Sequence, residues 1–324
     1  MNNRSGVSVV ICTHNGAGRL PKCLDALSKC AFESDGEVIV VDNNSTDDSA
    51  AVAASCWATA DDAPVPLRVV KEAKQGLTWA RRAGAQAAQY ELIVYCDDDN
   101  LLNPDYVIAA IELMRNPRVG AASGVARPVS CTDFPAWFYT FAEDYTVGCQ
   151  ARWPEEADVD MTPLEQRCPW GAGLVVRRQN LLKAISCPNF PLLVGRNGAI
   201  LSAGEDYEIC HLIALQGKRL VFSPRLKLDH YIPPERLNPE YLARLQAGFV
   251  EQTSVLQAYA ALRGLLKRKQ RKLVLEGFIQ LLKDAIRGRT IRHDMFAISV
   301  GIDRSLGLNE LQRRVFENYK FVRD

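Results

Sequence analysis

The sequence lacks the features that mark several classes of protein. Its 39 Lys and Arg residues nearly balance 38 Asp and Glu residues, giving a formal net charge of +1. No overall positive field therefore attracts nucleic acid, and we expect no nucleic-acid partner. No apolar run approaches the roughly 18 residues that a membrane-spanning helix needs, so none is predicted. The first residues carry one Arg and a short apolar run without a cleavage site, so we expect no signal peptide.

The ten cysteines lack the spacing of a zinc site or a disulfide framework. No C-x-x-C pair occurs, and no His lies at zinc-finger spacing. Cys12, Cys96 and Cys210 lie in apolar stretches, where a thiol behaves as a small hydrophobe. We therefore expect free buried thiols and a reducing, cytoplasmic location. Cys168 and Cys187, in predicted loops, are the pair most worth examining for a disulfide.

The composition is that of an ordinary globular protein. Hydrophobic residues make up 48% of the 324 residues and charged residues 24%, which excludes a disordered chain, a collagen or a coiled coil. The length allows one large domain or two modest ones. No internal repeat or low-complexity linker divides the chain, and the best candidate boundary lies near Pro233-Pro234.

Short apolar runs alternate with helical patterns over the first 130 residues. Continuous β-branched runs suit strands that are buried on both faces. We predict strands at 7–12, 37–41, 66–70 and 92–96, and helices at 19–30, 47–56, 77–89 and 103–114. Asn103 would cap the last helix, with Pro104 at its first position. This alternation predicts βαβ units and a parallel sheet.

The second part of the chain is less regular. We predict a helix at 137–152, a strand at 172–177, a helix at 205–216 and strands at 219–223 and 225–229. From Pro239 a helical pattern continues to about Arg289, with a break near Gly264.

Polar residues follow three of the predicted strands: Thr13-His14-Asn15, Asp42-Asn43-Asn44 and Asp97-Asp98-Asp99. Ligands of parallel sheets bind at the carboxyl ends of the strands, so we expect these three segments to meet in one crevice.

The three consecutive aspartates are the most telling feature. Adjacent carboxylates repel one another unless a cation or hydrogen-bond donors compensate. Their oxygens suit Mg²⁺ or Mn²⁺, ions usually held by one or two carboxylates plus substrate phosphates. The alternative is a solvated acidic turn. Asp42 is expected to be free for a base or ribose, while Asn43 and Asn44 form the turn.

Further candidate residues are weaker. Glu205 and Asp206 open a helix after Gly204, either as helix-stabilising acids or as a general base. His230 ends a short strand and is more often structural than a ligand. Lys74, Gly76, Arg81 and Arg82 surround a helix start; they either steer a diphosphate there or form an ordinary solvated face.

Taken together, the motifs resemble those of an inverting family 2 glycosyltransferase of the GT-A fold. The matching segments are VSVVICTHN at 7–15, VIVVDNNSTDDS at 38–49, LIVYCDDDN at 92–100, GED at 204–206 and DH at 229–230. Each is weak alone, but five in this order are specific. The resemblance implies an α/β fold, with a Rossmann-like, mostly parallel central sheet flanked by helices and a C-terminal helical extension.

The resemblance also implies domains. Residues 1–235 would be the catalytic domain, with 1–130 as its nucleotide-sugar half and 131–235 as its acceptor half. Residues 236–324 would be the helical extension.

The resemblance assigns roles to single residues. Asp206 would be the catalytic base, Asp99 a direct Mg²⁺ or Mn²⁺ ligand, and His230 an additional metal or diphosphate ligand. Family members often have Asn where this chain has Arg82, which puts that contact in doubt. The donor would be bound by Thr13, Asn15, Asp42, Gly76, Arg81, Asp97 and Asp98, and the acceptor by Trp170, Gly171 and Glu205.

The implied reaction moves a sugar from a nucleoside-diphosphate donor, by family habit a UDP-sugar, to a glycan or lipid-linked glycan of a bacterial surface polysaccharide. Two alternatives remain open: a nucleotidyltransferase on a similar fold, whose glycine-rich signature is not found at residues 10–25, and a non-catalytic scaffold. An oxidoreductase is excluded because G-x-G-x-x-G does not follow the first strand.

The segment at 263–292 interleaves basic and apolar residues. Such a stretch either lies on an anionic membrane or packs on the catalytic domain with its charges solvated. The first reading predicts peripheral contact with the inner membrane face.

Overall fold

Four parallel strands form the N-terminal part of a nine-stranded sheet. The computed structural model describes residues 4–60, 63–148, 157–196, 201–267 and 310–323. The four strands are β1 (Arg4–Thr13), β2 (Gly36–Asp42), β3 (Leu67–Lys71) and β4 (Tyr90–Asp97), in the order β3-β2-β1-β4. All their mutual pairings are parallel, as the sequence predicts.

Both faces of this part of the sheet are buried, which explains the unbroken apolar runs. Along β1, Val9 and Ile11 belong to one hydrophobic core, while Val10 and Cys12 belong to the other. The first core also contains side chains of α1 (Leu20–Ser28), α2 (Ser49–Ala58) and α4 (Tyr106–Met114). The second contains those of α3 (Leu77–Ala87), α5 (Arg178–Ile185) and α6 (Glu205–Leu215).

The remaining strands extend the sheet with mixed direction. Next to β4 come β8 (Val175–Arg177), β6 (Val119–Val129), β9 (Arg219–Tyr231) and β5 (Asn100–Leu102), in that order. β6 and β9 are parallel, whereas β8 and β5 pair antiparallel with their neighbours. The short β7 (Val159–Asp160) also pairs with β9. The sheet is therefore purely parallel only among β1, β2, β3 and β4.

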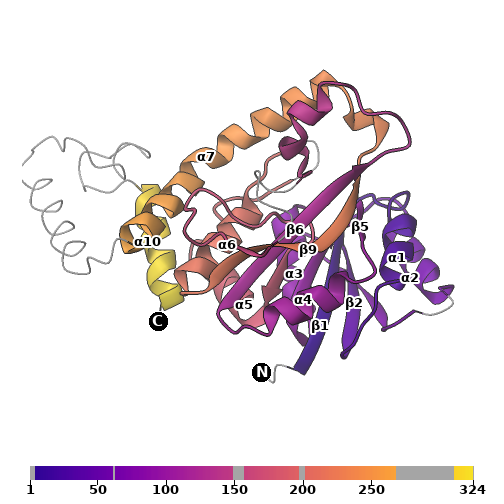
Figure 1. Ribbon diagram of the computed structural model, residues 1–324, viewed down its shortest axis with the longest axis horizontal. Helices are drawn as coiled ribbons and strands as arrows, with labels where there is room; N and C mark the ends of the chain where they lie inside the picture. The colour runs from indigo at the N-terminus through magenta and orange to yellow at the C-terminus, as the bar shows by residue number, and fades with distance from the viewer. Residues whose placement is uncertain (1–3, 61–62, 149–156, 197–200, 268–309, 324) are drawn as a thin grey trace, which may run out of the picture.

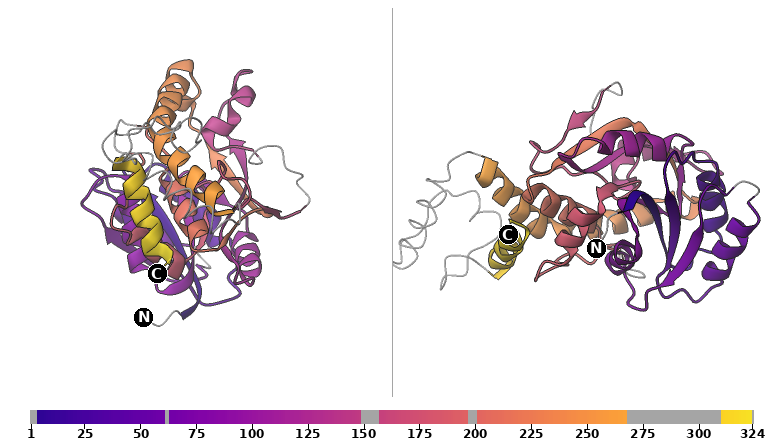
Figure 2. Two further views of the ribbon diagram at one scale, coloured as in Figure 1. Left: turned by 90° about the vertical axis from the view of Figure 1, so that its left-hand side faces the viewer. Right: turned by 90° about the horizontal axis from the view of Figure 1, so that it is seen from below.

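Two C-terminal helices pack against α6 and against each other. α7 (Pro239–Lys267) runs along one side of the molecule, and α10 (Glu310–Arg323) lies beside its C-terminal end (Figure 1). Figure 2 shows α10 and the C-terminal end of α7 at the opposite end of the molecule from α1 and α2. Tyr259 of α7 and Val315 of α10 belong to the same hydrophobic core as α6.

A buried polar link ties these helices to α6. The Glu208 carboxylate accepts hydrogen bonds from the Leu192 and Leu193 amides and, at 3.2 Å, from the Tyr259 hydroxyl. Asn318 of α10 donates to the same hydroxyl at 2.9 Å. Burial raises the pKa of Glu208 to about 7, and the hydrogen-bond donors oppose this effect. They stabilise the carboxylate in its buried position.

Several predictions of local structure are wrong. In the described part of the helix predicted at 137–152, two short 3₁₀ turns replace it, η1 (Phe138–Thr140) and η2 (Ala142–Tyr145); residues 149–152 lie outside the described residues. The two strands at 219–229 are one strand with an irregular register. α7 passes through Gly264 without a break, and α4 begins at Tyr106, so Asn103 is not its cap.

The cysteines in the described part of the chain are all free, including Cys168 and Cys187, which are both buried. Of these thiols only that of Cys131 is exposed. The expectation of free buried thiols is confirmed there. Within the same residues, no helix is long and apolar enough to cross a membrane.

The contact of α3 with β1 generates a stability prediction. A Cβ added to Gly84 would lie 2.3 Å from Cγ1 of Val10, so Gly84→Ala forces α3 away from the sheet. We expect the free energy of unfolding to fall by about 1–3 kcal/mol in denaturant titrations. Gly18→Ala is the control, because nothing lies within 4 Å of its new methyl group. Equal stability of the two variants would contradict this account of the packing.

Candidate active site

The three polar strand ends lie at one edge of the sheet, but the predicted single crevice is lined only by residues of the first and third, since Asn43 of the second lines a separate, smaller cavity. Thr13 pairs in register with Asp42, and Cys12 with Asp97. A crevice of about 330 Å³ opens at this edge. It is lined by all three consecutive aspartates and also by Asp206 and His230, which come from α6 and β9.

Each of the three aspartates has an arginine partner. Asp97 lies 3.4 Å from Nη2 of Arg81. Asp98 accepts two bonds of 2.8 Å from Arg19 and one of 2.6 Å from the Thr13 hydroxyl. The partner of Asp99 is Arg236, at 2.8 Å. The chain thus supplies its own cations to a cluster that would otherwise repel itself.

The environments of the two buried aspartates differ. Burial raises the pKa of Asp98, and Arg19 opposes that effect. For Asp99, burial acts in the same direction, but His230 and Arg236 outweigh it and hold its pKa well below the usual range. Asp99 is therefore the more strongly ionised carboxylate of the two.

Asp99 and His230 form a donor pair that fits a divalent cation. Oδ1 of Asp99 lies 3.6 Å from Nε2 of His230, because Asn100 and His230 pair in register between β5 and β9. The gap is too long for a hydrogen bond, and carboxylate and imidazole both ligate Mn²⁺. Within the described residues no cluster of three potential metal ligands occurs, so further ligands would come from substrate oxygens.

A smaller cavity of about 70 Å³ lies beside the crevice, between the ends of β1 and β2 and the start of α3. Thr13, His14, Asn43 and Gly76 line it. Nδ1 of His14 lies 2.9 Å from the Asn43 carbonyl oxygen, which fixes the imidazole ring. The Asn43 side chain accepts from the Gly76 amide and donates to the carbonyls of residues 72 and 74. The sequence analysis places His14 and Asn43 in the polar segments at the strand ends but gives neither a role in donor binding.

Two residues that are predicted to bind the donor lie outside both the crevice and the smaller cavity. Asp42 accepts a hydrogen bond from the Ser45 amide at 3.0 Å, so Asp42 itself stabilises the turn that was assigned to Asn43 and Asn44. Asn15 is exposed and accepts from the Thr46 amide. Neither Asp42 nor Asn15 lines the crevice or the smaller cavity.

The basic residues around the start of α3 separate into two groups. Arg81 lines the crevice, whereas Lys74 and Arg82 lie over the ring of Trp79, at 3.4 Å and 5.8 Å from its centroid. Lys74 and Arg82 are not among the lining residues of the crevice. Both cations pack over this ring outside the crevice, and Lys74 is exposed while Arg82 is half-buried.

Glu205 does not reach the predicted acceptor side. Its carboxylate is buried and lies 2.8 Å from Nη1 of Arg81. Burial raises the pKa of Glu205, while Arg81 lowers it and the neighbouring Asp206 raises it further. Glu205 and Gly171 line the crevice, not the second cavity described next.

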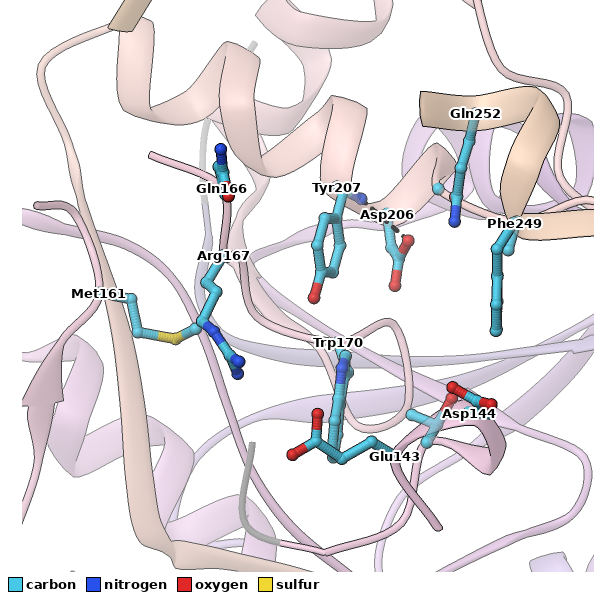
Figure 3. A pocket seen from close by; sticks show the side chains of 13 residues that line it. Glu143, Asp144, Met161, Gln166, Arg167, Trp170, Asp206, Tyr207, Phe249 and Gln252 are labelled. Atoms are coloured by element: carbon cyan, nitrogen blue, oxygen red, sulfur yellow. Dashed lines mark hydrogen bonds between the residues drawn. The ribbon is translucent and has the colours of Figure 1, made fainter. Parts of the chain in front are cut away.

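Asp206 lies between the crevice and a second cavity of about 400 Å³ and lines both. Its carboxylate accepts hydrogen bonds from the Gly171 amide at 2.7 Å and the Tyr207 amide at 2.9 Å. Burial raises its pKa, and Arg81 opposes that rise. Figure 3 shows the carboxylate pointing into the second cavity.

Aromatic and polar side chains line this second cavity. Trp170, a predicted acceptor residue, lies below Asp206 in the view of Figure 3, with Glu143 and Asp144 of η2 beside it. Phe249 and Gln252 of α7 close the other side. Aromatic faces combined with carboxylates and amides suit a ring that carries hydroxyl groups. Sequence reasoning did not anticipate the contribution of α7.

The N-terminal half of the chain is similar to known glycosyltransferases. Residues 8–182 match the family model described as "Glycosyl transferase family 2". An uncharacterized glycosyltransferase of Nostoc sp. is 28% identical over 113 residues, which are 35% of this chain and 34% of that protein. EpsH of Bacillus subtilis, a putative glycosyltransferase, is 30% identical over 100 residues, 31% of this chain and 28% of that protein. These matches span about a third of the relatives' length.

Solved structures of glycosyltransferases share the fold. S. aureus TarS 1–349 in complex with UDP-GlcNAc has a TM-score of 0.53 at 16% identity. The match covers 80% of this chain and 66% of the TarS chain, which is just under two thirds of the TarS chain's length. The mannosyltransferase PcManGT from Pyrobaculum calidifontis, in complex with GDP-Man and Mn²⁺, has a TM-score of 0.52 at 18% identity, over 98% and 86%. At these identities the likeness shows the fold, and the predicted GT-A fold is confirmed.

Proposed function

Because the family model covers more than half of it, the chain belongs to glycosyl transferase family 2, and we propose that it transfers a sugar from a UDP-sugar to a hydroxyl group with inversion. The observation that carries this proposal is the position of Asp206, which lines both the crevice and the second cavity. A donor in the crevice and an acceptor in the second cavity would then meet at one carboxylate.

The donor's diphosphate would lie against the positively charged side of the crevice. Arg19, Arg196 and Arg236 line it, together with His230. Part of the nucleoside would enter the smaller cavity beside Thr13 and Gly76, whose volume of about 70 Å³ is too small for the whole group. This proposal is supported by the complexes of TarS with UDP-GlcNAc and of GalNAc-T7 with UDP, GalNAc and Mn²⁺, which share the fold.

We propose Asp99 and His230 as the protein ligands of Mn²⁺ or Mg²⁺. A divalent ion bound there would supply positive charge to the departing diphosphate. The complex of PcManGT with GDP-Man and Mn²⁺ supports the proposal of a divalent ion. Asp97 and Asp98 would contact the ribose and metal-bound waters.

Asp206 would act as the general base. The acceptor oxygen attacks the anomeric carbon, the bond from that carbon to the diphosphate oxygen breaks, and Asp206 takes the hydroxyl proton. Attack from the face opposite the diphosphate inverts the anomeric centre. The two backbone amides of Gly171 and Tyr207 hold the carboxylate in place for this step.

The acceptor is proposed to be a glycan or lipid-linked glycan of a bacterial surface polysaccharide. The aromatic cavity beside Asp206 supports a sugar ring as its terminal group. Under the proposed division at residue 235, α7 of the extension would form one wall of the acceptor site, because Phe249 and Gln252 line that cavity.

A cytoplasmic location, with peripheral contact at an anionic inner membrane face, stays part of the proposal. Most of the basic segment at 263–292 lies outside the described residues. Cosedimentation of the protein with anionic but not neutral liposomes, reversed by salt, would support the membrane contact. Failure to bind either kind of liposome at low salt would count against the membrane contact.

The function is tested by a screen of UDP- and GDP-sugars for hydrolysis. We expect slow release of nucleoside diphosphate from a UDP-sugar in the presence of Mn²⁺, because water enters the second cavity when no acceptor fills it. Release should stop when EDTA removes the metal. Failure to bind or hydrolyse any sugar nucleotide would favour the scaffold alternative.

Asp99→Ala should remove the effect of Mn²⁺ on UDP affinity while the fold survives, because one of the two proposed protein ligands is lost. Isothermal titration with UDP, with and without Mn²⁺, measures this. Asp25→Ala, which removes an exposed carboxylate on α1, is the matched control and should behave as wild type. Unchanged Mn²⁺-dependent UDP binding by Asp99→Ala would refute the ligand assignment.

Asp206→Asn should bind UDP as the wild type does and release it from a UDP-sugar about 10²–10⁴-fold more slowly, since an amide cannot take the proton. Asp144→Asn, in the same cavity, should keep most of the wild-type rate. An Asp206→Asn variant that retained more than about a tenth of the wild-type rate would move the base to another residue.

A further inference from the structure

Arg81 is the buried cation at the centre of the site. Its side chain is 3% exposed and comes from the first turns of α3. Nη1 donates to Glu205 at 2.8 Å, and Nη2 lies 3.4 Å from Asp97. The Tyr95 hydroxyl donates to its backbone carbonyl at 2.8 Å, which fixes this turn of α3 against β4. Arg81 therefore joins the end of β4, on the donor side, to the start of α6.

The loop that holds Asp206 lies directly on this guanidinium. A Cβ added to Gly171 would lie 2.5 Å from Nη2 and 2.8 Å from Nη1 of Arg81. A side chain at position 171 would therefore displace the guanidinium of Arg81. The Gly171 amide donates to Oδ2 of Asp206 at 2.7 Å. The guanidinium thus sets the position of the donor that orients the carboxylate.

We propose that Arg81 is a positioning residue for the transfer reaction: by holding Glu205 and Asp97 and supporting the Gly171 backbone, it aims the Asp206 carboxylate at the boundary of the two cavities. This inference rests on the proposed function, in which Asp206 is the base. It differs from the donor-binding role that the sequence resemblance implies for Arg81.

The charge of Arg81 has a second effect on Asp206. Asp97 of β4 and Glu205 of α6 add negative charge nearby, and Arg81 of α3 opposes them. Facing Asp206 across the second cavity are Glu143 and Asp144 of η2 and Arg167, while α7 contributes the neutral Phe249 and Gln252. The thiols of Cys168 and Cys210 and the Tyr207 hydroxyl have pKa values raised by burial, so they add no charge near neutral pH.

The sign of the pH effect follows from these charges. Removing the cation favours the neutral carboxylic acid and raises the pKa of Asp206. Asp206 can accept a proton only when ionised, so the acidic limb of the rate profile moves to higher pH. Opposite charges within about 4–6 Å typically shift a carboxyl pKa by about 1–3 units.

The test measures release of UDP from a hydrolysed UDP-sugar between pH 5 and pH 9, a range that begins about one unit above the usual pKa of an aspartate carboxyl group. In Arg81→Met we expect the acidic limb to move up by about one unit or more, with kcat reduced more than KM is raised. Arg82→Met is the matched control, because that guanidinium lies over Trp79 on the same helix. Its acidic limb should match that of the wild type.

Two conservative variants distinguish the effect of the position of the Arg81 guanidinium from the effect of its charge. They also keep the proposal testable if Arg81→Met does not fold. Arg81→Lys keeps the charge but cannot span both carboxylates, so we expect a wild-type limb with a lower kcat. Gly171→Ala displaces the guanidinium and should also lower kcat without moving the limb. An unshifted limb in a folded Arg81→Met, or full wild-type kcat in Arg81→Lys, would overturn the proposal.

These outcomes are distinct from a failure of the proposed function. If Asp206→Asn kept its rate, the assignment of the base would fail regardless of Arg81. If Asp206→Asn lost its rate while Arg81→Met and Arg81→Lys behaved as wild type, only the positioning role would fail.

Discussion

The accumulation of negative charge at one edge of the sheet is the constraint on which the site depends. Asp97 ends β4, Asp98 and Asp99 follow it, and two more carboxylates open α6. Buried charges cost several kcal/mol each unless they are paired. The arginines that pair them come from separate parts of the chain, so the site exists only when α1, α3 and the turn after β9 are folded together.

The two-sided burial of the sheet explains why the strand ends are available for chemistry. Because helices cover both faces, most residues of β1, β2 and β4 are apolar, and the carboxyl ends of these strands carry Thr13, Asp42 and Asp97. The switch to antiparallel pairing at β8 brings β9 alongside β6, and β9 in turn pairs with β5. That pairing places His230 opposite Asn100 and hence next to Asp99, 131 positions earlier in the chain.

Features encoded locally were predictable from the sequence, and features that depend on distant partners were not. The strands at Val7–Cys12 and Leu92–Cys96 are unbroken apolar runs, and their polar ends are visible in the sequence. β6 was missed because Gly120, Gly124 and Pro128 weaken its strand pattern. Arg19 and Arg236 carry no local signal, since their partners lie 79 and 137 residues away. The predicted helix after Trp137 failed because Phe138 and Tyr145 pack in a small separate core with α7.

The hydrogen bonds from Asn318 to Tyr259 and from Tyr259 to Glu208 connect α10 to α6. Glu208 lies half a turn of helix beyond Asp206, about 3 Å along the axis at 1.5 Å per residue. Asp206 and Glu208 both lie in the continuous helix α6, so the hydrogen bonds through Tyr259 join α10 to the helix that bears the carboxylate. Buried hydrogen bonds thus connect the C-terminal helix α10 to the active site, although α10 lines neither the crevice nor the second cavity.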